Sequence, residues 1–185
     1  MLSEIEIQDF KSYKKATLPL SPLSILIGAN ASGKSNAIEA LRILNWIAQG
    51  QKLNAINLVV VEEVDNGIHP SRARQLLQAM RELAEKRQLR LLLTTHNPAL
   101  MDALPDEAIG DVVFCYRNPE NGYSELKKLS ALVDYPSLIA QGSLGHLVTN
   151  GVVERYAKSD CTPEQKKEKA LAWLAELDQE EEALC

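Results

Sequence analysis

A glycine-rich segment near the N-terminus combines residue types that can bind phosphate. Residues 28–35 read Gly-Ala-Asn-Ala-Ser-Gly-Lys-Ser, which fits the phosphate-loop pattern of two glycines, a lysine and a hydroxyl. The glycines let backbone N–H groups point into one concavity that can surround phosphate oxygens. Lys34 would reach the β and γ phosphates of a nucleotide, and Ser35 would be a ligand of Mg²⁺. A chance turn is the alternative, but the segment lies between an apolar run and an amphipathic run, as the motif requires.

Two carboxylates follow a second apolar run. Residues 58–61 read Leu-Val-Val-Val, and Glu62 and Glu63 come directly after them. A carboxylate at the end of a hydrophobic strand is where phosphate-loop enzymes hold the Mg²⁺ shell. We therefore predict that Glu62 orients Mg²⁺-bound water and that Glu63 polarises the attacking water. A solvated pair of charges at the end of a strand is the alternative.

A histidine follows a third apolar run. Residues 91–95 are followed by His96 and Asn97. Ligands bind at the carboxyl ends of the strands of a parallel sheet, which would bring His96 close to Gly28 and Glu62. Its imidazole could then form a hydrogen bond with a γ phosphate. A satisfied loop histidine is the alternative, and the convergence of three strand ends favours the functional interpretation.

The elements that would position these groups alternate between strands and helices. This order predicts an α/β fold with a mostly parallel sheet covered on both faces. Continuously apolar runs such as residues 23–27 and 58–61 are typical of strands buried on both sides. On the helix over residues 71–87 we expect five side chains to face inward: Leu76, Leu77, Met80, Leu83 and Ala84. The expected strands are residues 2–7, 16–20, 23–27, 58–61, 91–95, 112–116 and 124–129, and the expected helices are residues 34–48, 71–87 and 164–177.

The composition is that of an ordinary globular protein. Of the 185 residues, 45% are hydrophobic and 24% are charged, which excludes a disordered or collagen-like chain. No apolar run approaches the length of a membrane span, and the acidic N-terminus differs from a secretory leader. We therefore expect a cytoplasmic protein with no membrane partner and with three free cysteines. The net charge of −5 argues against a protein that coats nucleic acid.

Three segments together resemble one family. Residues 10–13 (Phe-Lys-Ser-Tyr), 62–70 and 95–98 are similar to the SMC/RecF-like branch of ABC-type ATPases. Within it they most resemble the bacterial AAA-family ATPases found near defence and DNA-repair systems. The resemblance implies a phosphate-loop ATPase head over residues 1–130, with an N-terminal antiparallel strand segment. We expect residues 131–185 to form a helical extension packed on this head.

The resemblance also implies roles for individual residues. Glu63 would be the catalytic glutamate and His96 the switch histidine, while Glu62, where many relatives have aspartate, would join Ser35 at the metal. Lys11 and Ser12 match a segment that approaches the nucleotide, and residues 66–69 match a dimer-contacting loop. A homodimer through the nucleotide face is implied, with DNA or an effector protein as a further partner. ATP and Mg²⁺ would bind at Asn30, Ala31, Ser32, Gly33, Lys34, Ser35 and Asn36.

One departure from the family pattern is large. The signature loop and the glutamine loop of ABC-type heads normally lie between the two motifs that here end at Ser35 and begin at Glu62. No signature appears between them; residues 143–145 (Ser-Leu-Gly) come too late, and Gln49 and Gln51 are only possible stand-ins for the glutamine. We therefore expect that a segment is absent between about residues 48 and 57, which would leave residues 58–61 as an exposed sheet edge. A minimal phosphate-loop protein is the alternative.

Two classes of function remain open. The first is an ATPase head that acts as an ATP-dependent dimerising switch or motor in DNA repair or phage defence, with hydrolysis impaired by the missing signature loop. The second is a nucleotide-binding module that does not hydrolyse ATP and docks a partner protein. A small-molecule kinase is disfavoured because no arginine-rich lid is visible. A GTPase is disfavoured because the sequence has no Asn-Lys-x-Asp element.

Overall fold

The computed structural model describes residues 2–49, 58–64 and 69–158. The predicted helix over residues 164–177, Gln51 and residues 66–68 therefore lie outside the described residues, as does the side chain of Gln49. In chain order the elements are β1 (Glu4–Phe10), β2 (Tyr13–Pro19), β3 (Leu23–Ile27), α1 (Lys34–Gln49), β4 (Leu58–Val61), α2 (Pro70–Arg87), β5 (Arg90–Thr94), α3 (Pro98–Asp102), α4 (Asp106–Ile109), β6 (Val113–Arg117), β7 (Ser124–Lys128), the 3₁₀ helix η1 (Leu129–Ala131), α5 (Tyr135–Ile139), α6 (Leu144–Thr149) and α7 (Val152–Lys158).

The central sheet has five strands in the order β4-β5-β3-β6-β7. The first four are parallel, and β7 returns antiparallel to β6. Leu23 pairs with Leu91 at the start of β3 and β5, and Leu58 pairs with Arg90 at the start of β4. The strand that leads into the glycine-rich loop, β3, therefore lies between β5 and β6. This arrangement confirms the predicted α/β fold with a mostly parallel sheet.

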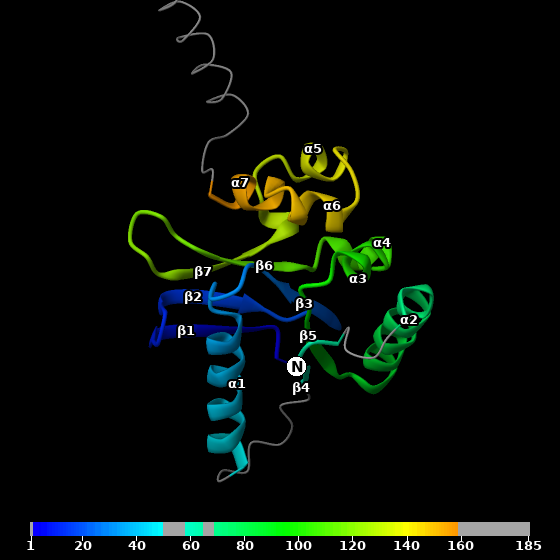
Figure 1. Cartoon of the computed structure of the whole chain (residues 1–185). Helices are drawn as coiled ribbons and strands as arrows, with labels where there is room; N and C mark the ends of the chain where they lie inside the picture. Colours follow the sequence, from blue (N-terminus) through cyan, green and yellow to red (C-terminus); the bar gives the residue numbers. More distant parts are fainter. Residues whose placement is uncertain (1, 50–57, 65–68, 159–185) are drawn as a thin grey trace, which may run out of the picture.

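Helices and a strand pair cover the two faces of the sheet (Figure 1). Alternate residues of β3 point to opposite sides, as a strand requires. Ile25 and Ile27 join a core built with α2, α3 and α5–α7. Leu26 joins a second core built with α1, β1 and β2. The apolar surface buried on both sides is the main force that holds β3, and with it the loop that follows, in place.

The first two strands form a separate antiparallel pair. Glu4 pairs with Pro19 at one end, and Phe10 pairs with Tyr13 at the turn. Both strands reach this turn, whereas the sequence predicted that the first would end at residue 7 and the second would begin at residue 16. Their polar outer face explains the difference, because alternation fades where charged residues such as Lys14 replace apolar ones. The turn brings residues 11 and 12 beside α1.

The strand β4 lies at the edge of the sheet rather than in its interior. Among the described residues it pairs only with β5, and Val59 is 43% exposed. The prediction of a strand buried on both faces is therefore wrong for residues 58–61. The expected exposed edge is confirmed, and the missing segment from which we derived it stays a prediction. The apolar sequence reflects contact with β5 and the second core.

The helix α2 buries a narrower stripe than its sequence predicts. As predicted, Leu77 and Ala84 are fully buried and Met80 is partly buried against the first core, but Leu76 is 39% exposed and Leu83 is 46% exposed. Ala73, which the pattern did not single out, is also buried. The prediction that the two exposed leucines face inward is wrong. Each lies one position before a buried residue, which rotates it by about 100° around the helix axis. The small side chains of Ala73 and Ala84 belong to the buried stripe, and the flanks of the helix lie in solvent.

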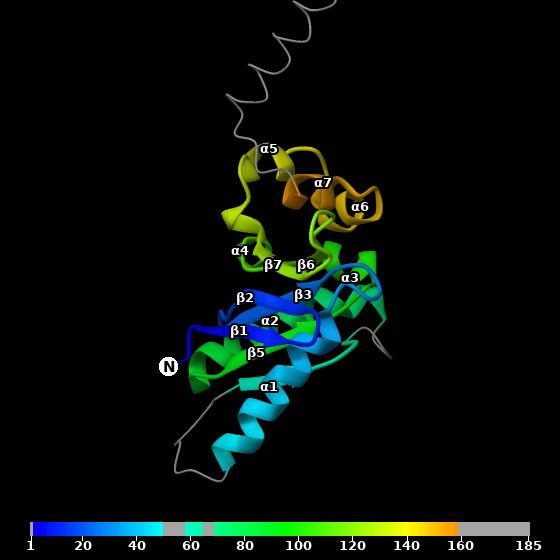
Figure 2. The same cartoon turned by 90° about the vertical axis from the view of Figure 1, so that its left-hand side faces the viewer.

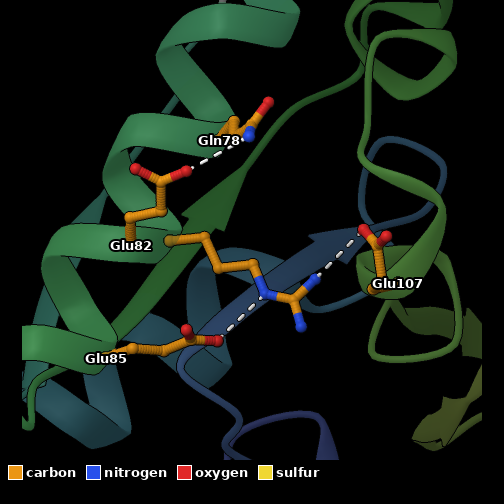
Figure 3. A network of polar contacts seen from close by, with 5 residues as sticks. Gln78, Glu82, Glu85 and Glu107 are labelled. Carbon is orange, nitrogen blue, oxygen red and sulfur yellow. Dashed lines mark hydrogen bonds and ion pairs between the residues drawn. The ribbon is translucent and has the colours of Figure 1, made fainter.

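A network of polar contacts joins α2 to α4 (Figure 3). The guanidinium of Arg81 lies 3.2 Å from Glu85 on the same helix and 3.6 Å from Glu107 on α4. One turn before it, the Gln78 amide donates to Glu82 at 3.1 Å. Exposed pairs of this kind contribute little stability. The apolar stripe of α2, not this network, therefore holds the helix on the sheet.

Short helices close the fold on the side of β6 and β7 (Figure 2). Tyr135 and Tyr156 are partly buried against the first core, and the Lys127 ammonium donates to the carbonyl of Ala157 at 2.7 Å. The described part of the C-terminal segment is helical, as expected. The division between the head and this extension at residues 130 and 131 stays a prediction. None of the helices in the described ranges is long and apolar enough to cross a membrane.

Two leucines of α2 provide a test of this packing. Leu77→Ala should lower the free energy of unfolding by about 2–5 kcal/mol, because it leaves a cavity against the sheet. Leu83→Ala on the same helix should change it by about 0.5 kcal/mol or less, because that side chain is half in solvent. Urea denaturation followed by circular dichroism measures both. Equal losses for the two variants would contradict the observed orientation of α2.

Candidate functional site

An open pocket lies where four parallel strands end. Gly28 follows β3, Glu62 follows β4, Thr95 follows β5, and Arg117 is the last residue of β6. Because these strands are parallel, their carboxyl ends meet at one edge of the sheet, the usual place for ligands in such folds. The pocket is lined by Asn30, Ala31, Gly33, Lys34, Ser35, Asn36, Ile38, Glu62, Glu63, Thr94, Thr95, His96 and Arg117.

Two glycines give the loop its shape. Gly28 has φ of 150°, and a Cβ atom there would lie 2.1 Å from the carbonyl oxygen of Cys115 on β6. Gly33 has φ of 120°, and a Cβ atom there would lie 2.3 Å from the Ser124 hydroxyl on β7. Both the conformation and the close approach therefore require glycine. The loop is thus pressed against β6 and β7 at both of its ends.

Side chains behind the loop bind its carbonyl oxygens. The Tyr13 hydroxyl on β2 donates to the carbonyl of Gly33 at 3.1 Å. The carbonyl of Ser32 accepts from the Ser124 hydroxyl at 2.5 Å and from the Cys115 thiol at 3.4 Å. These contacts hold the carbonyls on the rear side of the loop. The first N–H groups of α1 have no partner within the helix and are available at its N-terminus.

Burial keeps two of these donors protonated. It raises the pKa of the Tyr13 hydroxyl and the pKa of the Cys115 thiol, because neither charged form is solvated there. The two groups also lie 3.3 Å apart, within hydrogen-bond distance of each other. Their role behind the loop is therefore that of neutral hydrogen-bond donors.

Lys34 presents a cation to the pocket. Its ammonium donates to the carbonyls of Gly28 at 2.8 Å and Ala29 at 2.9 Å. Burial lowers the pKa of this lysine, because the neighbouring carbonyls only partly replace water around the charge. Within the described ranges it forms no ion pair with a carboxylate. An anion in the pocket would therefore gain a favourable charge interaction.

The two glutamates after β4 differ in their surroundings. Glu62 forms an ion pair with Arg42, which lies on α1. Glu63 has φ of 50°, an unusual conformation for a residue with a side chain. Its N–H donates to the Thr94 hydroxyl at 3.0 Å, and the next N–H, of Val64, donates to the Thr94 carbonyl at 3.1 Å. The end of β5 thus fixes the backbone that carries Glu63.

His96 is exposed and lines the same pocket. The turn around it is fixed locally, since Asn97 donates its N–H to the Thr95 hydroxyl at 3.0 Å. The Asn97 side chain then caps α3 by accepting from Ala99 at 2.9 Å. The histidine is therefore held at the pocket by the segment on either side of it. On α2, His69 has the same capping role, with Ser71 as donor.

Three predicted binding residues lie outside the pocket lining. Lys11 forms an ion pair with Glu39 on α1. The Ser12 hydroxyl accepts from the Asn36 amide at 2.7 Å and so fastens the β1–β2 turn to the first turn of α1. Ser32 is buried, and no partner of its hydroxyl is present among the described residues. The other predicted residues come together in the pocket: Asn30, Ala31, Gly33, Lys34, Ser35, Asn36, Glu62, Glu63 and His96.

The sequence did not identify Arg117 and Thr94 as residues of the pocket. Arg117 ends an apolar strand in the same way that Glu62 and His96 follow theirs, and this signal could have identified it. Thr94 is the last residue of its strand and is buried, so its position before His96 was the available signal. Tyr13, Cys115 and Ser124 act from behind the loop; Tyr13 lies in the Phe-Lys-Ser-Tyr motif but was given no role, and no local pattern marks Cys115 or Ser124.

Two family models match the chain on either side of the connection between α1 and β4. Residues 1–46, which contain the glycine-rich loop, match a model described as "AAA ATPase domain". Residues 53–102, which contain Glu62, Glu63 and His96, match a model described as "AAA domain, putative AbiEii toxin, Type IV TA system". The two halves of the pocket are therefore each matched by an AAA ATPase model.

Curated relatives match over stretches of 41 to 56 residues. The chain is 43% identical over 56 residues to the DNA replication and repair protein RecF of Gloeobacter violaceus, a stretch that covers 30% of this chain and 14% of that protein. It is 44% identical over 41 residues to RecF of Acidothermus cellulolyticus, covering 22% of this chain and 11% of the relative. For RecF of Streptococcus thermophilus the identity is 46% over 44 residues, a stretch that covers 23% of this chain and 12% of that protein. The matched stretches thus span only 11–14% of these relatives.

These matches confirm the resemblance to the SMC/RecF-like branch of ABC-type ATPases. The fold agrees with it, since a mostly parallel sheet flanked by helices is the architecture of a phosphate-loop ATPase. At this level two parts of the chain are similar to AAA ATPase domains, and a shorter part is similar to RecF, which supports a nucleotide-binding family.

Two glycines with positive φ test the close contact behind the loop. Gly122→Ala, at φ of 73° with no described atom within 4 Å of the new Cβ, should cost about 1 kcal/mol of unfolding free energy for the conformation alone. Gly33→Ala should cost about 2 kcal/mol or more, because its Cβ also collides with Ser124. Chemical denaturation compares them. A smaller loss at position 33 than at position 122 would contradict the contact between the loop and β7.

Proposed function

We propose that this chain is an ATP–Mg²⁺-binding ATPase head of the ABC type, which acts as an ATP-dependent dimerising switch or motor in DNA repair or phage defence. The single observation that carries the proposal is the convergence of Lys34, Glu63 and His96 on one pocket, from three different parts of the chain. The similarity to a DNA replication and repair protein and to a family described as a Type IV TA system toxin supports the biological context.

Nucleotide phosphates fit the positive end of this pocket. The loop between Gly28 and Lys34 opens onto the N-terminus of α1, where the helix dipole favours an anion. The Lys34 ammonium lies at the same end and is bound only to neutral carbonyls within the described ranges. A triphosphate would thus meet backbone N–H groups and the Lys34 cation together.

The Mg²⁺ that accompanies ATP fits two oxygen groups of the same pocket. The Ser35 hydroxyl and the Glu62 carboxylate both line the pocket, and Mg²⁺ prefers oxygen ligands with phosphates completing its shell. Bound there, Mg²⁺ would neutralise charge on the phosphates. Glu62 is paired with Arg42, so this carboxylate has to turn from the arginine toward the metal.

Hydrolysis would use the two groups at the far ends of β4 and β5. Glu63 would accept the proton of a water that attacks the γ phosphate, and His96 would donate a hydrogen bond to that phosphate. The backbone of Glu63 is held by Thr94, so the position of this base depends on the strand that also carries His96. We propose that a second copy of the head completes the site, as the resemblance implies, and that hydrolysis is impaired because no signature loop lies between residues 35 and 61.

The alternative is a nucleotide-binding module that does not hydrolyse ATP and docks a partner protein. The same absence of a signature sequence favours it. Removal of one charge-stabilising donor from an active site can reduce the rate by about 10²–10³, and a whole loop supplies several. Turnover of ATP by the purified protein, measured against a Lys34→Ala control, separates the two functions.

Nucleotide binding should depend on Lys34. Lys34→Ala should abolish detectable ATP–Mg²⁺ binding, with a loss of about 100-fold or more in affinity, because the cation at the phosphates is removed. Isothermal calorimetry measures this. Lys14→Ala removes the same charge from an exposed lysine paired with Asp9 and is the matched control. Equal affinity of the wild type and Lys34→Ala would refute the proposed site.

Any hydrolysis should depend on Glu63. Glu63→Gln should reduce turnover by about 10²–10⁴ and leave ATP bound, because the amide keeps the shape of the side chain but cannot accept a proton. Phosphate release and calorimetry on the same preparation give the two readouts. Glu82→Gln on the exposed flank of α2 controls for the change in net charge. Unchanged turnover in Glu63→Gln would remove this residue from the base role.

A further inference from the structure

Ala31 lies in the glycine-rich loop in an unusual conformation. Its φ is 62°, in the left-handed region that residues with a Cβ atom disfavour. Its exposed methyl group lines the pocket and gains no burial that would offset this cost. A left-handed residue within such a loop turns successive N–H groups toward one side and forms an anion-binding concavity. Some other contact has to keep Ala31 in this conformation.

Arg117 provides that contact. Its Nε donates to the carbonyl oxygen of Ala31 at 3.1 Å, although the two residues are 86 positions apart in the sequence. The same guanidinium donates from a terminal nitrogen to the carbonyl of Gly122 at 2.9 Å. A planar guanidinium offers donors in a rigid fork, so one bond fixes the direction of the other.

The β6–β7 hairpin holds the arginine in place. Gly122 belongs to the turn of this hairpin, where its N–H donates to the Asn118 carbonyl at 2.9 Å. The Asn118 N–H in turn donates to the Tyr123 carbonyl at 2.8 Å. Arg117 itself is the last residue of β6, which pairs with β3. The hairpin, the arginine and the loop thus form one connected unit.

We propose that Arg117 is a positioning residue for nucleotide phosphates, which acts by keeping Ala31 in the left-handed conformation. This inference rests on the proposed function, because it assumes that the loop binds phosphate. It assigns to the β6–β7 hairpin a part in nucleotide affinity, through the bond to Gly122. The predicted effect of the arginine passes through the backbone of Ala31, not through a charge contact with the phosphates.

A double-variant cycle separates these two routes. R117A should weaken ATP–Mg²⁺ binding about tenfold, which corresponds to about 1.4 kcal/mol, the order of the conformational cost at an alanine. R117K should show a similar loss, because one ammonium cannot reproduce the fork. In the A31G background, R117A should cost less than about twofold, because glycine adopts this φ without a side-chain penalty. R87A removes an exposed arginine at the C-terminal end of α2 and controls for the change in net charge.

The affinity for ATP–Mg²⁺ is measured by calorimetry on the wild type, R117A, A31G and the double variant, and on R117K and R87A. An equal loss from R117A in both backgrounds would overturn the positioning role and assign Arg117 a direct phosphate contact. No loss from R117A would overturn it as well, and so would rescue by R117K.

A second readout needs no nucleotide. R117A should lower the melting temperature of the ligand-free protein, and it should lower it less in the A31G background than in the wild type. Equal shifts in the two backgrounds would overturn the coupling. If the wild type binds no ATP, the proposed function fails, and this thermal cycle still decides whether Arg117 holds Ala31.

Discussion

The structure of the pocket depends on hydrogen bonds that reach the glycine-rich loop from behind. Tyr13 from β2, Cys115 and Arg117 from β6, and Ser124 from β7 together bind the carbonyls of residues 31–33. A loop that faces a ligand with its N–H groups has its carbonyls turned away, and buried carbonyls require donors. The sheet order places β6 directly beside β3, so that these donors reach the loop. The loop carbonyls thus require β6 beside β3. The same parallel alignment of strands brings Glu62 and His96 to the edge of the sheet where the loop lies.

The sequence predicted the parts of the site whose signals are local. The loop, the paired glutamates and His96 each follow a short apolar strand, and a parallel sheet then brings them together. The supporting residues escaped prediction because they act over long separations, 83 positions between Cys115 and Ser32 and 92 between Ser124 and Ser32. Burial on α2 was overestimated for a similar reason. The pattern of leucines defines a broad apolar face, and the tertiary contacts of the helix, which the local pattern does not contain, decide how much of it is covered.

The ion pair between Arg42 and Glu62 ties the helix after the loop to the strand that carries the carboxylates. Arg42 lies in the part of the chain that the first family model matches, which ends at residue 46. Glu62 lies in the part that the second model matches, which begins at residue 53. The pair is exposed, with side-chain exposures of 70% and 39%, and contributes little to stability. Its significance is geometric, because it fixes the direction of a carboxylate that the proposed metal would also require. The proposed metal and the ion pair with α1 would therefore use the same carboxylate.

The sheet order also sets when the pocket can form during synthesis of the chain. The strand β3 is buried on both faces, yet its two neighbours, β5 and β6, begin at residues 90 and 113. A nascent chain that has emerged only as far as α2 thus carries the loop on an unpaired apolar strand. The donors from β6 and β7 follow later still. Pairing of strands that are so far apart in the sequence is slow, and an apolar strand that is still unpaired is prone to aggregation. On the ribosome, the glycine-rich loop therefore emerges before β5, β6 and β7, the strands that fix its final geometry.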